Sequence, residues 1–181
     1  MNSASMTIKH IGDLPPFFDR YITKVDPEKS LREAFEMYSP AKLLEPLLPQ
    51  LIELADDVYA PEKWTIKQML QHCIDTERIM GYRALAFARG DTNNLPGFDE
   101  NEYAKNANLE GLDVKILIDE FDIVRGCNVL MLRKFTETEL LRMGKANNIN
   151  ISPLALGFVL VGHLMHHVDV IKERYLSLLK K

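Results

Sequence analysis

The chain has 181 residues, of which 46% are hydrophobic and 27% charged, as expected of one soluble globular domain with its own core. Its net charge of −4 lacks the basic excess that electrostatic binding needs, so no nucleic acid is expected as a partner. The N-terminus has no apolar secretory segment. The longest apolar run, from Leu154, is broken at His163, so no uninterrupted run reaches the length of a bilayer, which predicts a cytoplasmic protein with no membrane partner.

The first quarter of the chain is predicted to be partly irregular. Residues 1–30 lack helical periodicity and are expected to form an arm or short helix docked by its aromatic residues. A helix is predicted over 31–38. Ser39 precedes a proline and is typical of an N-cap for the next helix, which Pro46 and Pro49 should kink or break.

The middle of the chain contains the strongest helix signals. Thr65 and Gln68 form a capping-box pattern that begins a helix predicted to end near Ala88. The segment 91–112 is rich in asparagine, glycine and proline and is predicted to be a long loop, which is often functional in compact domains. The helical periodicity then returns over 113–135.

The last third is predicted to hold a short helix and then a long one. The short helix follows Thr136, a loop is expected over 144–151, and Ser152 begins a helix that ends near Leu179. No strand pattern is convincing. The predicted fold is therefore an all-α four-helix bundle over residues 31–181, with the extra N-terminal arm and short connecting helices.

Three of the five histidines fall within five consecutive residues of the last helix, at His163, His166 and His167. An apolar helix has no packing reason to gather imidazoles, because each buried ring needs a hydrogen-bond partner. His163 and His167 share one helix face, which is the spacing of a two-histidine metal half-site. The pair His163 and His166 is nearly as good, and Asp169 adds an oxygen candidate. The alternative is structural, with the rings bound to carboxylates across the bundle.

His72 lies two turns into the second long helix and would supply a third imidazole if the two helices face each other. Three neutral imidazoles suit zinc, nickel, copper or iron, and three protein ligands with an open position are typical of a catalytic zinc. Leu164 stands where the HExxH motif has its general base, which excludes that metalloprotease mechanism. Asp75 is a candidate to orient the His72 ring or to accept a proton.

Other polar residues have both a functional and a structural interpretation. Arg78, Arg83 and Arg89 are candidates to bind a substrate carboxylate, although solvated helix faces are the commoner explanation for arginine. Glu77 is a candidate base, but an exposed helix face explains it at least as well. The segment 95–100 is either a lid over a metal site or a structural crossover.

Several short segments together carry a family resemblance: 59–65, 72–78, 82–83, 88–91, 95–100, 162–163, 166–167 and 173–175. In these segments the chain resembles the DinB/YfiT-like superfamily of metalloenzymes, and the resemblance covers most of the chain. The superfamily consists of four-helix bundles and includes bacterial low-molecular-weight thiol transferases and maleylpyruvate isomerases. The segments are specific for the superfamily and say little about the substrate.

The resemblance implies that His72, His163 and His167 bind a divalent metal, usually nickel or zinc, and that His166 does not. It implies a metal-dependent enzyme that acts on a small-molecule substrate. A thiol S-transferase or a related hydrolase is favoured, with a low-molecular-weight thiol as a candidate cofactor and Asp75 as the catalytic proton acceptor. The rival interpretations are a thiol-dependent isomerase and a non-catalytic metal-binding or ligand-binding protein of the stress response. A homodimer paired through helix faces is left open.

Overall fold

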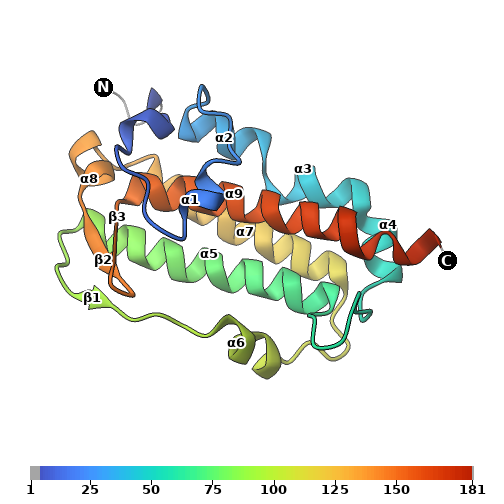
Figure 1. Ribbon diagram of the computed structural model, residues 1–181. Helices are drawn as coiled ribbons and strands as arrows, with labels where there is room; N and C mark the ends of the chain where they lie inside the picture. The colour runs from blue at the N-terminus through green and yellow to red at the C-terminus, as the bar shows by residue number, and fades with distance from the viewer. Residues whose placement is uncertain (1–4, 181) are drawn as a thin grey trace.

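The computed structural model describes residues 5–180 and shows a mostly helical protein (Figure 1). The helices are α1 (Asp19–Ile22), α2 (Leu31–Met37), α3 (Pro40–Leu44), α4 (Leu48–Glu53), α5 (Ile66–Ala88), α6 (Glu100–Asn106), α7 (Val114–Leu132), α8 (Glu137–Leu141) and α9 (Pro153–Val170). A π-helical segment (Ile171–Tyr175) continues α9, and 3-10 turns lie at Ile8–His10, Glu45–Leu47 and Leu178–Lys180. A small sheet contains β1 (Asn94–Leu95), β2 (Gly144–Ala146) and β3 (Ile149–Ile151). The predicted all-α class is confirmed.

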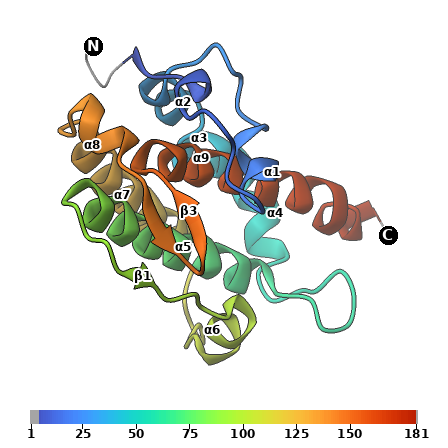
Figure 2. The same ribbon diagram turned by 60° about the vertical axis from the view of Figure 1, so that its left-hand side comes forward.

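The bundle has α5 and α7 running in the same direction, with α9 opposite to both (Figure 1). The hydroxyl of Tyr175, beyond the end of α9, donates to the carbonyl oxygen of Trp64, just before α5, so these two helices are antiparallel. Because α5 and α7 are parallel, the connection 89–113 must return along the length of the bundle, and Figure 2 shows it passing β1 and α6 on the way. Three short helices, α2, α3 and α4, take the place of a fourth long helix and form the divided layer of the bundle.

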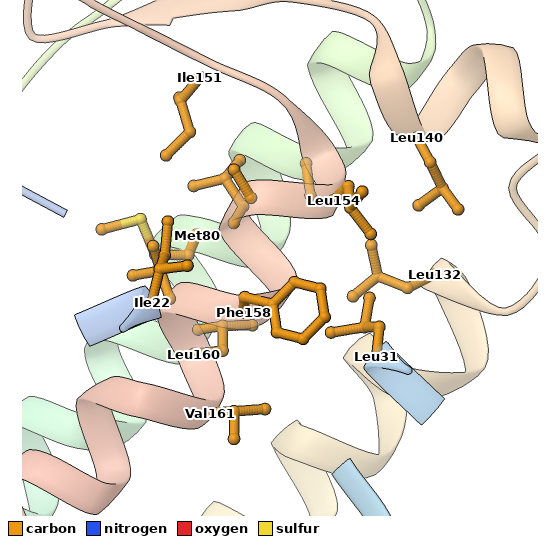
Figure 3. Packing of buried hydrophobic residues seen from close by; sticks show 14 of the residues in the cluster. Ile22, Leu31, Met80, Leu132, Leu140, Ile151, Leu154, Phe158, Leu160 and Val161 are labelled. Atoms are coloured by element: carbon orange, nitrogen blue, oxygen red, sulfur yellow. The ribbon is translucent and has the colours of Figure 1, made fainter. Parts of the chain in front are cut away.

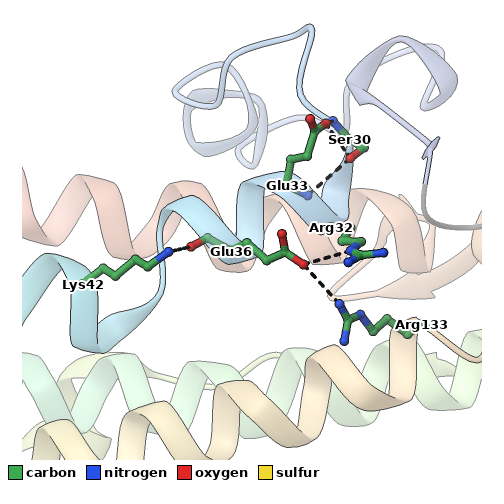
Figure 4. A network of polar contacts seen from close by, with 6 residues as sticks. All are labelled: Ser30, Arg32, Glu33, Glu36, Lys42 and Arg133. Carbon is green, nitrogen blue, oxygen red and sulfur yellow. Dashed lines mark hydrogen bonds and ion pairs between the residues drawn. The ribbon is translucent and has the colours of Figure 1, made fainter.

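Local capping explains where the helices of this divided layer begin. Ser30 and Glu33 form a capping box at α2, in which the Ser30 hydroxyl accepts from the Glu33 amide at 3.3 Å (Figure 4). The carboxylate of Glu36 accepts from Arg32 at 2.8 Å and from Arg133, at the end of α7, at 3.2 Å. These pairs are exposed and contribute little stability, but they fix α2 against the end of α7.

Three other sequence predictions for this layer and its neighbour are confirmed. The side chain of Ser39 caps α3 by accepting from the Lys42 amide. A 3-10 turn that contains Pro46 separates α3 from α4, as the prolines require. Thr65 and Gln68 form the predicted capping box at α5.

Two predicted loops contain regular structure instead. The segment 144–151 is a hairpin, and its turn residues Asn147 and Asn148 have positive φ values of 48° and 64°, as a tight hairpin turn requires. The segment 91–112 contains β1 and also α6, whose N-cap Asp99 accepts from two backbone amides. The prediction that no strand would form is therefore wrong, because strands of two or three residues are too short to show periodicity.

Within the described residues, buried hydrophobic side chains form one cluster at each end of the bundle. Figure 3 shows Ile22 of α1 and Leu31 of α2 in the same cluster as Phe158 of α9, so the N-terminal arm contributes to the core. The segment Pro153–Tyr175 is long and apolar enough to cross a membrane, but 78% of that apolar stretch is buried in the protein. Its position as the central helix of the core explains its composition.

Candidate metal centre

The three histidines His72, His163 and His167 converge between α5 and α9, although His72 is 91 residues from His163. The Nε2 atom of His163 lies 3.0 Å from Nε2 of His72 and 3.1 Å from Nε2 of His167. One nitrogen from each ring lies within 4.8 Å of the others. All three side chains are buried, with 6–8% of each residue exposed.

The other ligand candidates of the last helix lie outside this cluster. His166 is half-buried, and its ring packs edge-on against Tyr21 with 5.6 Å between the centroids. Asp169 is exposed and binds the ammonium group of Lys24 at 2.7 Å. The helix face therefore selects the i, i+4 pair, because His166 is turned about 100° away from His167.

The nitrogen contacts of the cluster cannot all be hydrogen bonds. A neutral ring nitrogen either donates one proton or offers one lone pair, so Nε2 of His163 can make at most one good bond with its two partners. The Nδ1 atoms of His72 and His167 are buried and have no partner among the described residues. With a proton on each Nδ1, three Nε2 lone pairs converge, which matches the donor set of a divalent metal.

Burial keeps the three rings neutral. Desolvation, and then the nearby charge of His166, lowers the pKa of His72 to about 4. Desolvation also holds the pKa values of His163 and His167 well below the ordinary histidine value, with further lowering by the neighbouring rings. Neutral imidazole is the form that binds a metal, so the site is in the right protonation state at neutral pH.

A glycine places the N-terminal helix against the cluster. A Cβ atom on Gly162 would lie 1.9 Å from the carbonyl oxygen of Tyr21, so any larger residue would push α1 away from α9. This close approach brings the Tyr21 ring edge-on to His163, with 5.1 Å between the centroids. The arm thus covers one side of the site, and burial raises the pKa of the Tyr21 hydroxyl.

Trp64 covers another side of the site. Its ring lies 4.6 Å from the ring of His72 and 6.5 Å from that of His167, between centroids. Its carbonyl oxygen accepts from Tyr175, which fixes the residue at the end of the bundle. Trp64 directly precedes the N-cap Thr65, and its indole packs on His72, two turns into α5.

A cavity of about 340 Å³ opens from the three histidines toward solvent. Much of its wall is aromatic: Phe17, Phe18, Tyr21, Trp64 and Phe98. Gly97, Phe98 and Glu100 bring the 95–100 segment to the cavity, while Leu95 belongs to β1 and is buried in the core. The segment is therefore a structural crossover that also lines the cavity.

The polar lining of the cavity has charges of both signs. Arg20 is exposed and lies over the ring of Phe17, 3.9 Å from its centroid. Arg83 is 4% exposed, Thr76 is 3% exposed, and Glu100 is an exposed carboxylate. Of these four residues, only Arg83 was a separate candidate from the sequence. Thr76 and Glu100 lie within the resemblance segments 72–78 and 95–100, where nothing in the spacing distinguishes them from their neighbours.

A family comparison follows from this fold and site. A sequence model of the DinB superfamily matches residues 28–171. The chain belongs to the DinB superfamily. No curated protein matches the sequence. Among solved structures, the fold is similar to that of YfiT from Bacillus subtilis, with a TM-score of 0.66 and 21% sequence identity over 89% of this chain and 87% of that one. YfiT is described as a probable metal-dependent hydrolase with an unusual four-helix bundle topology.

Asp75 lies outside the histidine cavity of this DinB protein. Its carboxylate accepts from the Gln71 amide at 2.9 Å and lines a neighbouring cavity of about 520 Å³ between α5 and α6. Arg78 approaches it at 3.8 Å. Among the described residues, Asp75 makes no contact with His72. The carboxylate that lines the histidine cavity is that of Glu100.

Glu77 is not on an exposed helix face, which corrects that interpretation. It is 1% exposed, and its carboxylate binds Arg125 of α7 at 2.6 Å and accepts from Asn128 at 2.8 Å. Arg125 also donates to the carbonyl oxygen of Leu160 in α9 at 2.8 Å. This network crosses the bundle between its two apolar clusters and is a structural unit.

The remaining sequence candidates on α5 and at its end are either exposed or buried in the core. Arg78 binds Glu120, and Arg89 binds Glu139, both at the surface, as expected for solvated helix faces. Cys73 is buried in the core beside His72, where desolvation raises the pKa of its thiol, so it offers no thiolate to the site.

Proposed function

We propose that this DinB protein is a metal-dependent enzyme whose metal is held by His72, His163 and His167. The observation that carries the proposal is the convergence of three neutral Nε2 donors within 4.8 Å at the inner end of a 340 Å³ cavity. A structural zinc site is usually closed by four protein ligands, whereas three leave a position for a reactant. The cavity provides the space for one.

The donor set favours zinc or nickel, which imidazole binds well. Such a metal lowers the pKa of a water or thiol nucleophile and so supplies it in reactive form at neutral pH. The fold supports this chemistry by keeping the three rings neutral and by covering them with Tyr21 and Trp64, which limit the access of bulk water.

The cavity residues have separate roles in this proposal. Glu100 begins α6 at the cavity and is positioned to accept a proton that a nucleophile releases. The aromatic wall holds the apolar body of a small-molecule substrate. Asp75, which sequence analysis favoured as the proton acceptor, lines a different cavity, so we assign this role to Glu100.

Two reactions fit this arrangement. Hydrolysis is supported by the description of YfiT as a probable metal-dependent hydrolase with a similar fold. Transfer of a low-molecular-weight thiol to an electrophile is supported by the lining of the cavity, in which Glu100 is the one carboxylate among the described residues, because a metal held by the three histidines would supply the thiol in reactive form without a strong protein base. We propose that the activity is thiol S-transfer or hydrolysis. The two reactions differ in the nucleophile, which is a thiol in the first and water in the second.

Elemental analysis of the purified, untagged protein tests the metal site first. We expect about one nickel or zinc per chain in the wild type, loss of the metal in the His163→Ala variant, and retention in His166→Ala. His166 is the matched control because it lies on the same helix, beside the cluster, and does not converge with it. Less than half a metal per chain that His163→Ala does not change would refute the site.

An activity panel then separates the two reactions. The metal-loaded protein would be incubated with ester and amide substrates, and with electrophiles plus bacillithiol or glutathione. Hydrolysis without thiol supports the hydrolase, and consumption of thiol with the electrophile supports the transferase. No turnover in either arm, with the metal bound, would contradict the enzymatic proposal and favour a metal-binding protein.

A further inference from the structure

Arg83 is a buried cation that has no anionic partner among the described residues. It is 4% exposed and lines the histidine cavity from α5. Its guanidinium donates to the carbonyl oxygen of Pro96 at 2.7 Å and weakly to the sulfur of Met80 at 3.5 Å. In the part of the chain that the structure describes, no carboxylate lies within ion-pair distance of it. An unpaired buried charge is costly, so its retention calls for an explanation.

Thr76 supplies an independent observation in the same cavity. Its hydroxyl is buried, the residue is 3% exposed, and the oxygen has no hydrogen-bond partner among the described residues. A threonine in a helix usually satisfies its hydroxyl on the carbonyl oxygen one turn earlier, which here belongs to His72. This hydroxyl is instead unpaired among the described residues, on a side chain that lines the cavity.

Helix geometry aligns these groups with the proposed metal ligand. Thr76 is four residues after His72 and Arg83 is eleven residues after it, which corresponds to rotations of about 40° and 20° around α5. The three residues therefore share one helix face, with their Cα atoms spread over about 16 Å. The contact with Met80 shows that the Arg83 side chain extends back along the helix toward His72, as helical side chains do.

The charge and the walls of the cavity together define a ligand. Glu100 lines the cavity but makes no ion pair with Arg83, and Arg20 adds a second cation. The walls between the cations are aromatic and apolar. A carboxylate or phosphate group fits the unpaired guanidinium and hydroxyl, and an apolar body fits the walls.

We propose that Arg83 and Thr76 form an anion-binding subsite, so that the substrate of this cavity is a small organic anion with an apolar or aromatic body. The inference rests on the proposed function only in taking the cavity as the substrate site. The oxyanion binds at Arg83, and the apolar body extends along α5 toward the three histidines.

A structural role for Arg83 is the competing explanation, because its bond to the Pro96 carbonyl oxygen anchors the 95–100 crossover. That role uses one arm of the guanidinium and involves no charge. It predicts no preference of the cavity for anions, and it gives Thr76 no function. Binding measurements distinguish the two explanations.

The test uses the metal-free protein and the fluorescence of Trp64, the single tryptophan, which lines the cavity. The protein is titrated with benzoate, phenyl phosphate and benzamide, a neutral ligand of similar shape. We expect at least one anion to bind about tenfold more tightly than benzamide, because hydrogen bonds to a charged group are strong. Benzoate or phenyl phosphate, whichever binds better, identifies the class of anion.

Variants locate the charge preference. Arg83→Met should reduce it to less than about twofold, and Thr76→Val, which leaves the Pro96 bond intact, should weaken anion binding about threefold. Arg89→Met, which removes an exposed charge at the end of the same helix, should leave it unchanged. Circular dichroism checks that each variant folds. If Arg83→Met fails that check, the Thr76→Val variant decides.

Equal binding of anions and benzamide by the wild type would overturn the inference, and so would a preference that survives both Arg83→Met and Thr76→Val. Neither result depends on the metal. A protein that takes up one metal per chain but shows no anion preference refutes this subsite and leaves the proposed function standing. A protein that prefers anions but takes up no metal supports this subsite and refutes the proposed function.

Discussion

Two sets of buried polar side chains lie between the helices of this bundle, and they differ in how many of their polar atoms have hydrogen-bond partners. In the Glu77–Arg125–Asn128 network, both carboxylate oxygens of Glu77 accept hydrogen bonds and Arg125 reaches a backbone carbonyl of α9. In the histidine cavity, two Nδ1 atoms and the Thr76 hydroxyl lack partners among the described residues, and Arg83 lacks an anion.

The difference separates structure from function in one helix. Glu77 follows Thr76 directly on α5, yet the two face different neighbours. Buried polar groups are normally satisfied by the protein, because each unsatisfied group costs free energy. A satisfied network therefore indicates a structural unit, and a cluster of unsatisfied groups around a cavity indicates a ligand site.

The largest effect is expected from breaking the satisfied network. Glu77→Ala leaves the Arg125 guanidinium buried and unpaired, and should lower the free energy of unfolding by about 3–5 kcal/mol. Urea denaturation measures this change. The double variant Glu77→Leu with Arg125→Met removes both charges and should lose much less. If both variants lose equal stability, packing rather than pairing is the source of the effect.

A pH dependence is expected from the unsatisfied cluster in the metal-free protein. The folded state holds the pKa of His72 at about 4, against about 6.5 when unfolded, so between these values the unfolded chain binds a proton that the folded chain does not. The free energy of unfolding should therefore fall as the pH falls through this window, by about 3 kcal/mol at pH 4 from His72 alone.

His163 and His167 shift in the same direction and add to this dependence. Urea denaturation at a series of pH values from 7.5 to 4 measures the slope, and His163→Ala should reduce it because that variant removes one of the buried rings. A metal-free protein whose stability is constant between pH 6.5 and 5 would show that the rings are not buried in neutral form.

A smaller effect is expected where α1 covers the histidines. Gly162→Ala places a methyl group against the backbone of Tyr21 and should lower the free energy of unfolding by about 1–3 kcal/mol. Gly126→Ala on α7 is the matched control, because a Cβ there meets nothing within 4 Å, and it should raise stability by about 0.5–1 kcal/mol. Equal effects in urea denaturation would mean that the close approach of α1 is unimportant.

Local rules predicted the helices of this protein well, because caps such as Thr65 and Ser39 act within a few residues. The spacing of His163 and His167 predicted a shared face, and the place of His72 on a second helix made it a candidate partner. The family resemblance then selected these three and set His166 aside. The burial of Glu77 was out of reach, since its partner Arg125 lies 48 residues away on another helix. Long-range pairing decides which polar residues are buried, and a single sequence does not contain it.

The smallest effect is expected at Asp75, where sequence and structure favour different roles. A carboxylate that orients a metal-binding ring changes metal affinity about 10–100-fold when removed. Asp75 binds Gln71 instead, and the Nδ1 atom of His72 has no partner among the described residues, so Asp75→Asn should change the affinity less than about twofold. Competition with a chromophoric chelator measures it, with Asp169→Asn as an exposed control on α9. A tenfold loss in Asp75→Asn alone would restore Asp75 to the metal centre and show that unpaired atoms at this cavity are satisfied by the protein after all.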